Sequence, residues 1–235
     1  EKLPRVGKKI LVTGNGRCNL TNMNSASSGF RGDTDFAYAV LNKYTPESNI
    51  EFFNEMGLYT RVEDEGRVYP LSNQASSVLD ALRFECDRLG VEVVCDYNVV
   101  HVKSVFNGVV QKLVINNKDR FDYVVIASGG KAAKVHGTDG DSYDLLKMVG
   151  HKINPIAPAL VSLNCDNFTK ALKGVRSICK MDLIIDGEKV LENYGEVQFT
   201  DYGLSGIPIM QLSRFVSMSP SEDISINIDV TPDFS

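Results

Sequence analysis

Residues 124–130 read Val-Val-Ile-Ala-Ser-Gly-Gly, and this stretch decides the fold class. Its first four residues are apolar without polar alternation, which predicts a short central strand that is buried on both faces. The small residues that follow allow a ligand or another backbone to approach the carboxyl end of that strand, where open α/β sheets bind their ligands. A tight turn with nothing bound is the alternative interpretation. The stretch therefore predicts an α/β domain with a candidate site at this turn.

Helices and strands are predicted on the amino-terminal side of this stretch. Apolar residues recur at three- and four-residue spacing from about Gln74 to Leu89, with Ser72 or Asn73 as the N-cap and Gly90 at the end, which predicts an amphipathic helix. Strands are predicted at 8–13, 91–95, 99–105 and 109–115, short helices at 36–41 and 50–56, and a hairpin at 59–69. This order is typical of an α/β domain with a small antiparallel crossover.

The pattern changes after a second predicted helix at 141–149. Pro155 and Pro158 interrupt the chain, and short strand-like pieces follow at 159–163, 181–185, 189–191, 196–199 and 224–228. We therefore place a domain boundary near Ile156, with one domain at 1–156 and a mainly β domain at 157–235. Pro208 is expected to open the helix of the second domain, because its φ angle suits a first turn.

The composition excludes several classes of protein. The chain has 235 residues, of which 43% are hydrophobic, and this is typical of a globular protein with a sizeable core. A net charge of −5 and the lack of a long basic run argue against a nucleic-acid partner. No apolar stretch approaches the roughly 18 residues of a membrane span, and no signal peptide is visible. The five scattered cysteines predict reduced thiols in a cytoplasmic protein.

An Asn- and Gly-rich loop follows the predicted strand at 8–13. Gly14-Asn15-Gly16 resembles the start of a G-x-G-x-x-G dinucleotide turn, but the third glycine, the following amphipathic helix and the later acidic residue are missing. The backbone N–H groups of such a loop can line an anion-binding nest, and Arg17 can pair with a phosphate. An irregular turn with a solvated arginine is an equally open interpretation.

Residues after the 124–130 stretch give weaker signals. Among the histidines, His136 is placed to meet a ligand because it lies in the loop after the glycines. Asp139, Asp141 and Asp144 lack the spacing and the closing glutamate of a calcium loop, so no metal site is predicted.

Four stretches taken together resemble a known family. They are RVGKKILVTGNGRCNLTN at 5–22, EDEGRVYPLSNQASSVLDAL at 63–82, VVIASGGKAA at 124–133 and GEVQFTDYGLSGIPIMQLSR at 195–214. These stretches resemble the bacterial FAD-dependent oxidoreductases described as aminoacetone-oxidase-like or BaiN-like flavoproteins. The resemblance implies a Rossmann-like FAD-binding domain with an inserted mainly β substrate domain. It also implies that the FAD domain is incomplete at both ends here, since the chain starts on Glu1 without the preceding glycine-rich turn.

The resemblance also implies the residues that contact the cofactor. Glu1 matches the acidic residue at the end of a strand that hydrogen-bonds the adenosine ribose, and the loop from Gly14 to Thr21 matches the segment along the pyrophosphate and flavin. Val100 matches a strand residue whose backbone meets adenine. The full set of expected FAD-binding residues is Glu1, Lys2, Arg5, Lys8, Gly14, Asn15, Gly16, Arg17, Cys18, Asn19, Leu20, Thr21, Val100, Ala127, Ser128, Gly129 and Gly130.

The resemblance implies a flavin oxidoreductase. The intact protein is expected to transfer a hydride or electrons between a small organic substrate, or NAD(P)H, and the flavin. No catalytic acid or base, substrate or oligomeric state is predicted. The alternative is a non-catalytic ligand-binding domain that keeps the fold and does not retain FAD. This chain alone is expected to bind FAD weakly or not at all, because the pyrophosphate-binding turn of such folds would precede Glu1.

Overall fold

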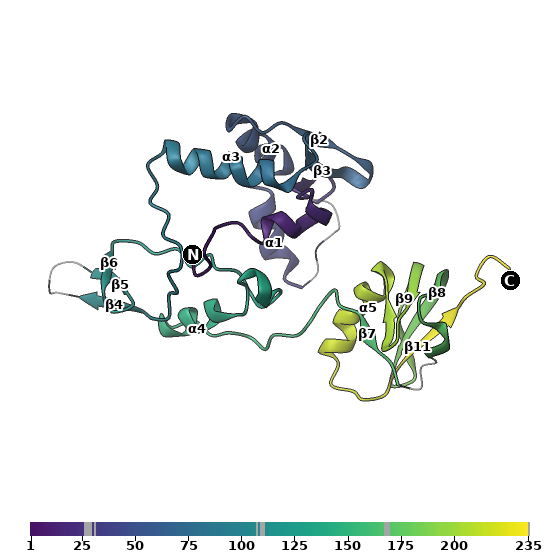
Figure 1. The fold of residues 1–235 in the computed structure, drawn as a ribbon. Helices are drawn as coiled ribbons and strands as arrows, with labels where there is room; N and C mark the ends of the chain where they lie inside the picture. Colours follow the sequence, from purple (N-terminus) through teal and green to yellow (C-terminus); the bar gives the residue numbers. More distant parts are fainter. Residues whose placement is uncertain (26–29, 31, 107, 109–110, 167–169, 235) are drawn as a thin grey trace. The chain divides into compact units, whose positions relative to one another are not determined.

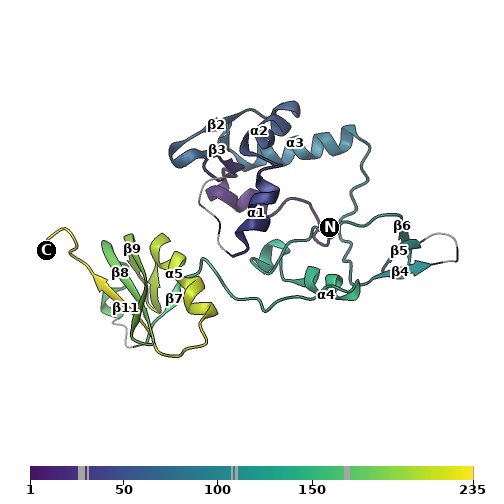
Figure 2. The same cartoon turned by 180° about the vertical axis from the view of Figure 1, so that it is seen from behind.

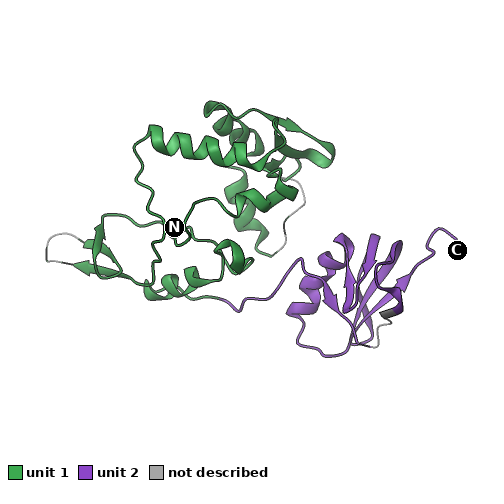
Figure 3. Ribbon diagram, viewed as in Figure 1, with its two compact units in different colours: residues 1–153 green, residues 154–235 purple. Residues whose placement is uncertain are grey.

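The computed structural model describes residues 1–25, 30, 32–106, 108, 111–166 and 170–234. The chain forms two compact units, Glu1–Ile153 and Asn154–Ser235 (Figure 3). The division between them falls close to Ile156, where the proline-containing segment lies. Within the described part of the chain, no helix has the length and apolar character that crossing a membrane requires.

The first half of unit 1 combines short helices with a small antiparallel sheet (Figure 1). Its three strands lie in the order β1-β3-β2, and β1 and β2 each pair with β3. The elements are η1 (Ile10–Gly16), β1 (Thr21–Asn22), α1 (Thr34–Leu41), α2 (Pro46–Glu55), β2 (Thr60–Val62), η2 (Asp64–Gly66), β3 (Arg67–Pro70) and α3 (Ala75–Arg88).

Local capping explains where the helices of this half begin. The Asp33 side chain accepts a hydrogen bond from the backbone N–H of Phe36 (3.0 Å) at the start of α1. At the start of α2, Thr45 accepts from Ser48 (3.3 Å), and Pro46 occupies the first turn. The predicted helices and the predicted hairpin are therefore confirmed.

The long helix α3 is also confirmed, but its predicted cap is wrong by one or two residues. The N-cap is Gln74, which makes no side-chain capping bond, and the backbone before it turns at Asn73 with a φ of 63°. The helix buries Ala75 and Val78 against Cys18 of the preceding loop. This packing joins α3 to η1.

The second half of unit 1 carries another antiparallel sheet and the helix α4. The strands β4 (Val102–Phe106), β5 (Gln111–Ile115) and β6 (Asp119–Phe121) lie in the order β4-β5-β6. They are followed by η3 (Lys134–His136) and α4 (Asp141–Met148). Figure 2 shows the same arrangement from behind. The predicted strand at 99–105 begins only at Val102, and residues 109 and 110 of the next predicted strand lie outside the described residues.

Three predicted strands of unit 1 are wrong in this structure. Residues 124–127 and 91–95 have no regular secondary structure, and Val125 and Val93 are 87% and 50% exposed. A strand buried on both faces needs hydrogen-bonded neighbours on both edges, and no described residue supplies them here. Residues 8–13 contribute instead to η1, because the chain turns at Gly7 (φ 75°) and Ile10 donates a hydrogen bond back to its carbonyl (3.0 Å).

Unit 2 is a five-stranded antiparallel sheet with one long helix. Its strands lie in the order β11-β8-β9-β10-β7, and α5 packs against the sheet (Figure 1). The elements are β7 (Leu163–Asn164), η4 (Lys170–Leu172), β8 (Arg176–Ile185), β9 (Glu188–Phe199), β10 (Gly203–Ser205), α5 (Ile207–Met218) and β11 (Ile224–Asp229). The buried core comprises Cys179, Met181, Leu183, Val197, Phe199, Leu204, Ile209 and Leu212.

The strands predicted for this region are mostly confirmed, and Pro208 lies in the first turn of α5 as expected. The predicted pieces at 189–191 and 196–199 are parts of the single strand β9. The piece at 159–163 is wrong except for its last residue, because Leu160 has a φ of 54°, which breaks an extended backbone. Gly203 allows β7 and β10 to meet, since a Cβ there would lie 2.2 Å from the carbonyl oxygen of Leu163.

Replacing Leu183 with alanine tests the core of unit 2. Leu183 is fully buried, so L183A should destabilise unit 2 by about 2–5 kcal/mol through lost burial and a residual cavity. Ile178 on the same strand is 45% exposed, and I178A is the matched control with a smaller expected effect. Hydrogen exchange of β8 and β9 amides in the whole chain measures both changes. Equal losses for the two variants would contradict the assignment of the buried face.

Candidate functional site

The segment after residues 124–127 forms a tight turn held by buried polar side chains. Ser142, in the first turn of α4, donates a hydrogen bond from Oγ to the carbonyl oxygen of Gly129 (2.5 Å). Thr138 and Ala133 exchange backbone hydrogen bonds of 3.2 Å, and the Ala133 N–H also reaches Thr138 Oγ1 (3.0 Å). Ser142 and Thr138 are only 5% and 8% exposed. Burial of satisfied hydroxyls of this kind fixes the shape of the turn.

Gly129 is required by this geometry for two reasons. Its φ is 81°, which lies in the left-handed region that favours glycine. A Cβ at this position would also lie 2.8 Å from Thr138 Cγ2, so a side chain would force the turn open.

This turn borders a cavity of about 570 Å³ in unit 1. The volume lies within the range of clefts that hold small molecules and cofactors. Six of the residues predicted to bind the cofactor line it: Glu1, Lys2, Lys8, Ala127, Ser128 and Gly129. Other lining residues were not predicted from the sequence, among them Lys9, Tyr97, Val102, Gly137, Thr138, Asp141 and Leu145.

Glu1 lies at the cavity without being part of a regular strand. Its backbone carbonyl accepts a hydrogen bond from Tyr97 (3.0 Å), and the Leu3 carbonyl accepts one from Asp96 (3.2 Å). These contacts do not follow a strand ladder, so the expected strand end at Glu1 is not formed. The Glu1 carboxylate accepts a hydrogen bond from the Leu3 N–H (2.8 Å) and remains exposed, which leaves acceptor capacity for a ligand hydroxyl.

Lys2 bridges Asp139, which lies just before α4, and Asp141, which is the first residue of α4. Its Nζ lies 2.7 Å from Asp139 Oδ1 and 2.8 Å from Asp141 Oδ2. Burial opposes the charge of Lys2, but the bonds to both acids outweigh it and raise the pKa. The hydrogen bond with Asp141, together with the Lys2 ammonium, holds the pKa of Asp139 far below its usual range. The sequence signal for these acids was the G-T-D-G-D stretch, which reads as a capping loop.

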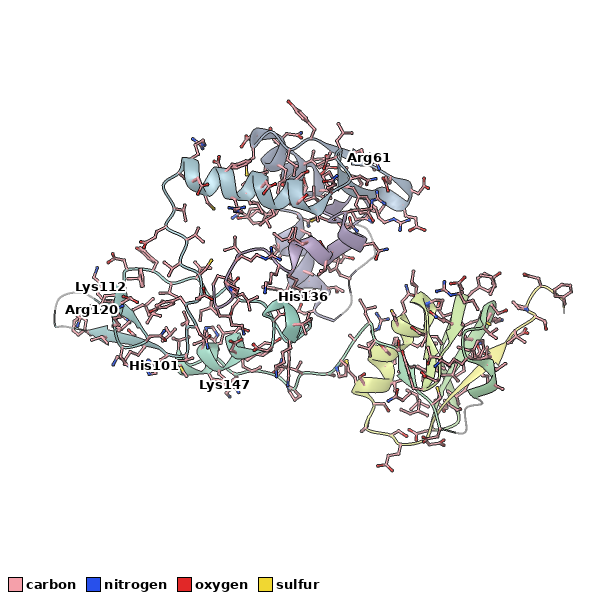
Figure 4. The ribbon with its side chains drawn as sticks, in the orientation of Figure 1. Arg61, His101, Lys112, Arg120, His136 and Lys147 are labelled. Atoms are coloured by element: carbon pink, nitrogen blue, oxygen red, sulfur yellow. The ribbon has the colours of Figure 1, made fainter. Side chains whose placement is uncertain are left out.

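The remaining basic groups of the cavity have no such internal partners. Lys8, Lys9 and His136 line it, and no side-chain hydrogen bond or ion pair joins any of them to another described residue. Figure 4 shows His136 on η3, close to the start of α4. This arrangement gives the cavity basic side chains that have no ion-pair partner among the described residues, and it suits an anionic ligand.

None of the residues from Gly14 to Thr21 that were expected at the cofactor lines this cavity. The Arg17 guanidinium stacks on the Tyr69 ring, with Cζ 3.8 Å from the ring centroid, and Nη2 lies 2.5 Å from Glu63. Cys18 is buried in the cluster with α3. These contacts attach the loop to the hairpin and to α3.

The other expected residues, Arg5, Val100 and Gly130, are not among the residues that line the cavity. The N–H of Val100 donates to Asn116 Oδ1 (2.9 Å), so a further acceptor such as adenine would have to displace that bond. Arg5 lines a different cavity of about 670 Å³ beside α3. Gly130 lies against Tyr143, whose hydroxyl would be 2.8 Å from an added Cβ.

Within the described residues there is no group of three or more His, Cys, Asp or Glu side chains that could hold a metal ion. All five cysteines are free thiols.

Residues 1–216 match the family described as the HI0933-like protein Rossmann domain. The chain belongs to this family. The predicted family resemblance and the Rossmann-like α/β class are therefore confirmed. The sheets that the described residues of this chain form are antiparallel. The parallel sheet of the Rossmann-like class is therefore not formed by these residues alone.

Two relatives show how far the similarity extends. The chain is 38% identical over 240 residues to a 3-dehydro-bile acid delta(4,6)-reductase of Clostridium scindens, with 99% of this chain and 58% of the relative covered. It is 25% identical over 235 residues to a ribosomal RNA dihydrouridine synthase of Haemophilus influenzae, with 97% of this chain and 56% of the relative covered. The chain thus spans a little more than half the length of these curated relatives.

The depressed pKa of Asp139 leads to a prediction about acid stability. A carboxyl whose pKa is lowered by folding stabilises the protein above its ordinary pKa, and this contribution is lost as the pH falls through the folded value. The D139N variant should therefore lose less stability than wild type as the pH falls from about 5. The measurement is the urea concentration at the unfolding midpoint of unit 1, determined at each pH from the amide NMR signals of that unit.

Asp144 provides the control for this prediction. It pairs with Lys147 at 3.1 Å, and the two side chains are 71% and 59% exposed. The D144N variant should keep the wild-type acid dependence. Parallel curves for wild type and D139N would contradict the role given to the Lys2–Asp139 pair.

Proposed function

We propose that this protein is an FAD-dependent oxidoreductase, and that the cavity of unit 1 holds the adenosine and pyrophosphate end of the cofactor. The observation that carries the proposal is that Glu1, the Gly129 turn and the basic side chains of Lys8, Lys9 and His136 all line the same cavity. The reaction is the transfer of a hydride or electrons between a small organic substrate, or NAD(P)H, and the flavin. When bound, the isoalloxazine ring supplies the redox chemistry.

The chemistry of the lining residues fits a dinucleotide. The Glu1 carboxylate offers acceptor oxygens for ribose hydroxyls, and Lys8, Lys9 and His136 offer donors for a pyrophosphate. Gly129 lets the turn pack against Thr138, which fixes the backbone that lines this side of the cavity. The role of the chain is thus to bind and orient the cofactor.

The relatives support a reductive reaction without defining the substrate. One is named a reductase and the other a dihydrouridine synthase, and their names specify a bile acid and ribosomal RNA. Because these substrates differ, neither is assigned to this chain. The net charge of −5 favours a small molecule over RNA. The free thiols support a cytoplasmic location.

Replacing Glu1 with glutamine tests the proposed site. In the intact protein, E1Q should raise the dissociation constant of FAD by about tenfold, since a charge-assisted hydrogen bond to a ribose hydroxyl is lost. The binding is measured by isothermal titration of FAD into the apoprotein. E92Q is the matched control, because Glu92 is exposed and does not line the cavity.

Two results would contradict the proposal. Intact protein that is purified without the visible absorption of flavin, and that does not take up added FAD, would favour the non-catalytic alternative. Wild-type affinity in E1Q would show that Glu1 does not contact the cofactor.

A further inference from the structure

The loop from Gly14 to Cys18, which ends η1 and continues toward β1, has a strained backbone. Gly14, Asn15, Gly16 and Cys18 have φ angles of 53°, 55°, 81° and 60°, so two residues with side chains occupy the left-handed region. Such conformations are unfavourable for residues with side chains and persist only where surrounding contacts impose them. The Cys18 N–H donates to the Thr13 carbonyl (3.0 Å), which closes the loop on itself.

Arg17 supplies the main side-chain attachment of this loop. Its Nε donates to Asn73 Oδ1 (2.6 Å), its Nη2 donates to Glu63 Oε1 (2.5 Å), and its plane stacks on Tyr69. These three groups come from the hairpin and from the residues before α3. A planar guanidinium can make all three contacts at once, whereas a lysine ammonium is a single point charge on a flexible stem.

Glu63 is itself held in place. Its N–H donates to the Arg67 carbonyl (2.7 Å) across the hairpin, and its Oε1 also accepts from Arg61 Nε (2.9 Å). Figure 4 shows Arg61 at this hairpin. The bond to Arg17, with a further contribution from Arg61, lowers the pKa of Glu63. Arg17 is therefore fixed by a charged partner that is ordered independently of it.

We propose that Arg17 is a positioning residue and that Glu63 is the group through which it acts. Together they fix the end of η1, whose first residue Ile10 lines the proposed FAD cavity, and the guanidinium does not itself contact FAD. This inference rests on the proposed function. It differs from the expectation that the arginine pairs directly with the cofactor, and the difference is measurable.

The E63Q variant separates the two roles because they predict opposite signs. If Arg17 contacts the FAD phosphates, removing the competing carboxylate frees its charge, and FAD affinity is unchanged or higher. If Arg17 positions the loop, E63Q weakens its attachment, and the FAD dissociation constant in the intact protein rises by about tenfold. R17K should then behave like E63Q although it keeps the positive charge.

Two variants control for indirect effects. R61Q removes the second donor to Glu63 and leaves the Arg17 contacts and the Glu63 N–H bond to Arg67, so it should raise the FAD dissociation constant clearly less than E63Q does. N73G removes the acceptor of Arg17 Nε, and glycine tolerates the φ of 63° at this position. N73G should raise the dissociation constant in the same direction as E63Q. All titrations are made below the unfolding temperature of each variant, and the absorption spectrum of the bound flavin is compared at saturation.

Hydrogen exchange without FAD makes the test independent of the proposed function. In E63Q the amides at 14–20 should exchange at least tenfold faster than in wild type, while α5 of unit 2 is unchanged. A merely structural role of Glu63 would lower the unfolding temperature and leave the FAD dissociation constant and the bound-flavin spectrum as in wild type, which would overturn the inference. Tighter FAD binding by E63Q, or wild-type affinity in R17K, would also overturn it. A wild-type protein that binds no FAD refutes the proposed function instead.

Discussion

The hydrogen bond from Ser142 to the carbonyl of Gly129 is the constraint on which the candidate site depends. It ties the turn after the apolar segment to the first turn of α4. Because Thr138 fills the space where a Cβ of residue 129 would lie, the turn admits only glycine without rearrangement. The same segment places Asp139 and Asp141 against Lys2, so one short stretch fixes both the backbone and the charge at this side of the cavity.

The charges of unit 1 fall into two groups with different roles. Lys2 and Arg17 are committed to carboxylates within the chain, and each joins segments that are far apart in sequence. Lys8, Lys9 and His136 line the cavity without such partners among the described residues. The first group therefore shapes the unit, and the second is available to an anionic ligand. Lys8 and Arg17 were both expected to contact the cofactor, but only Lys8 lines the cavity, whereas Arg17 is paired with Glu63.

Local patterns were sufficient to predict the helices and hairpins. The periodicity of α3 and the position of Pro208 in α5 both act within a few residues. The apolar runs at 91–95 and 124–127 were misassigned because a strand needs partners that the run itself does not specify. Glu63 lies 46 positions from Arg17, so no spacing rule connects them. Glu1 and the Gly129 turn were brought together only through family resemblance.

Hydrogen exchange with and without FAD tests the central claim, that the cavity beside the Gly129 turn is the cofactor site. FAD should slow exchange by at least tenfold at the amides of 128–138 in the intact protein. The strands β8 and β9 of unit 2 serve as an internal reference, and the exchange of their amides should not change when FAD binds to this cavity. Unchanged exchange at 128–138 in protein that is saturated with FAD would contradict the account.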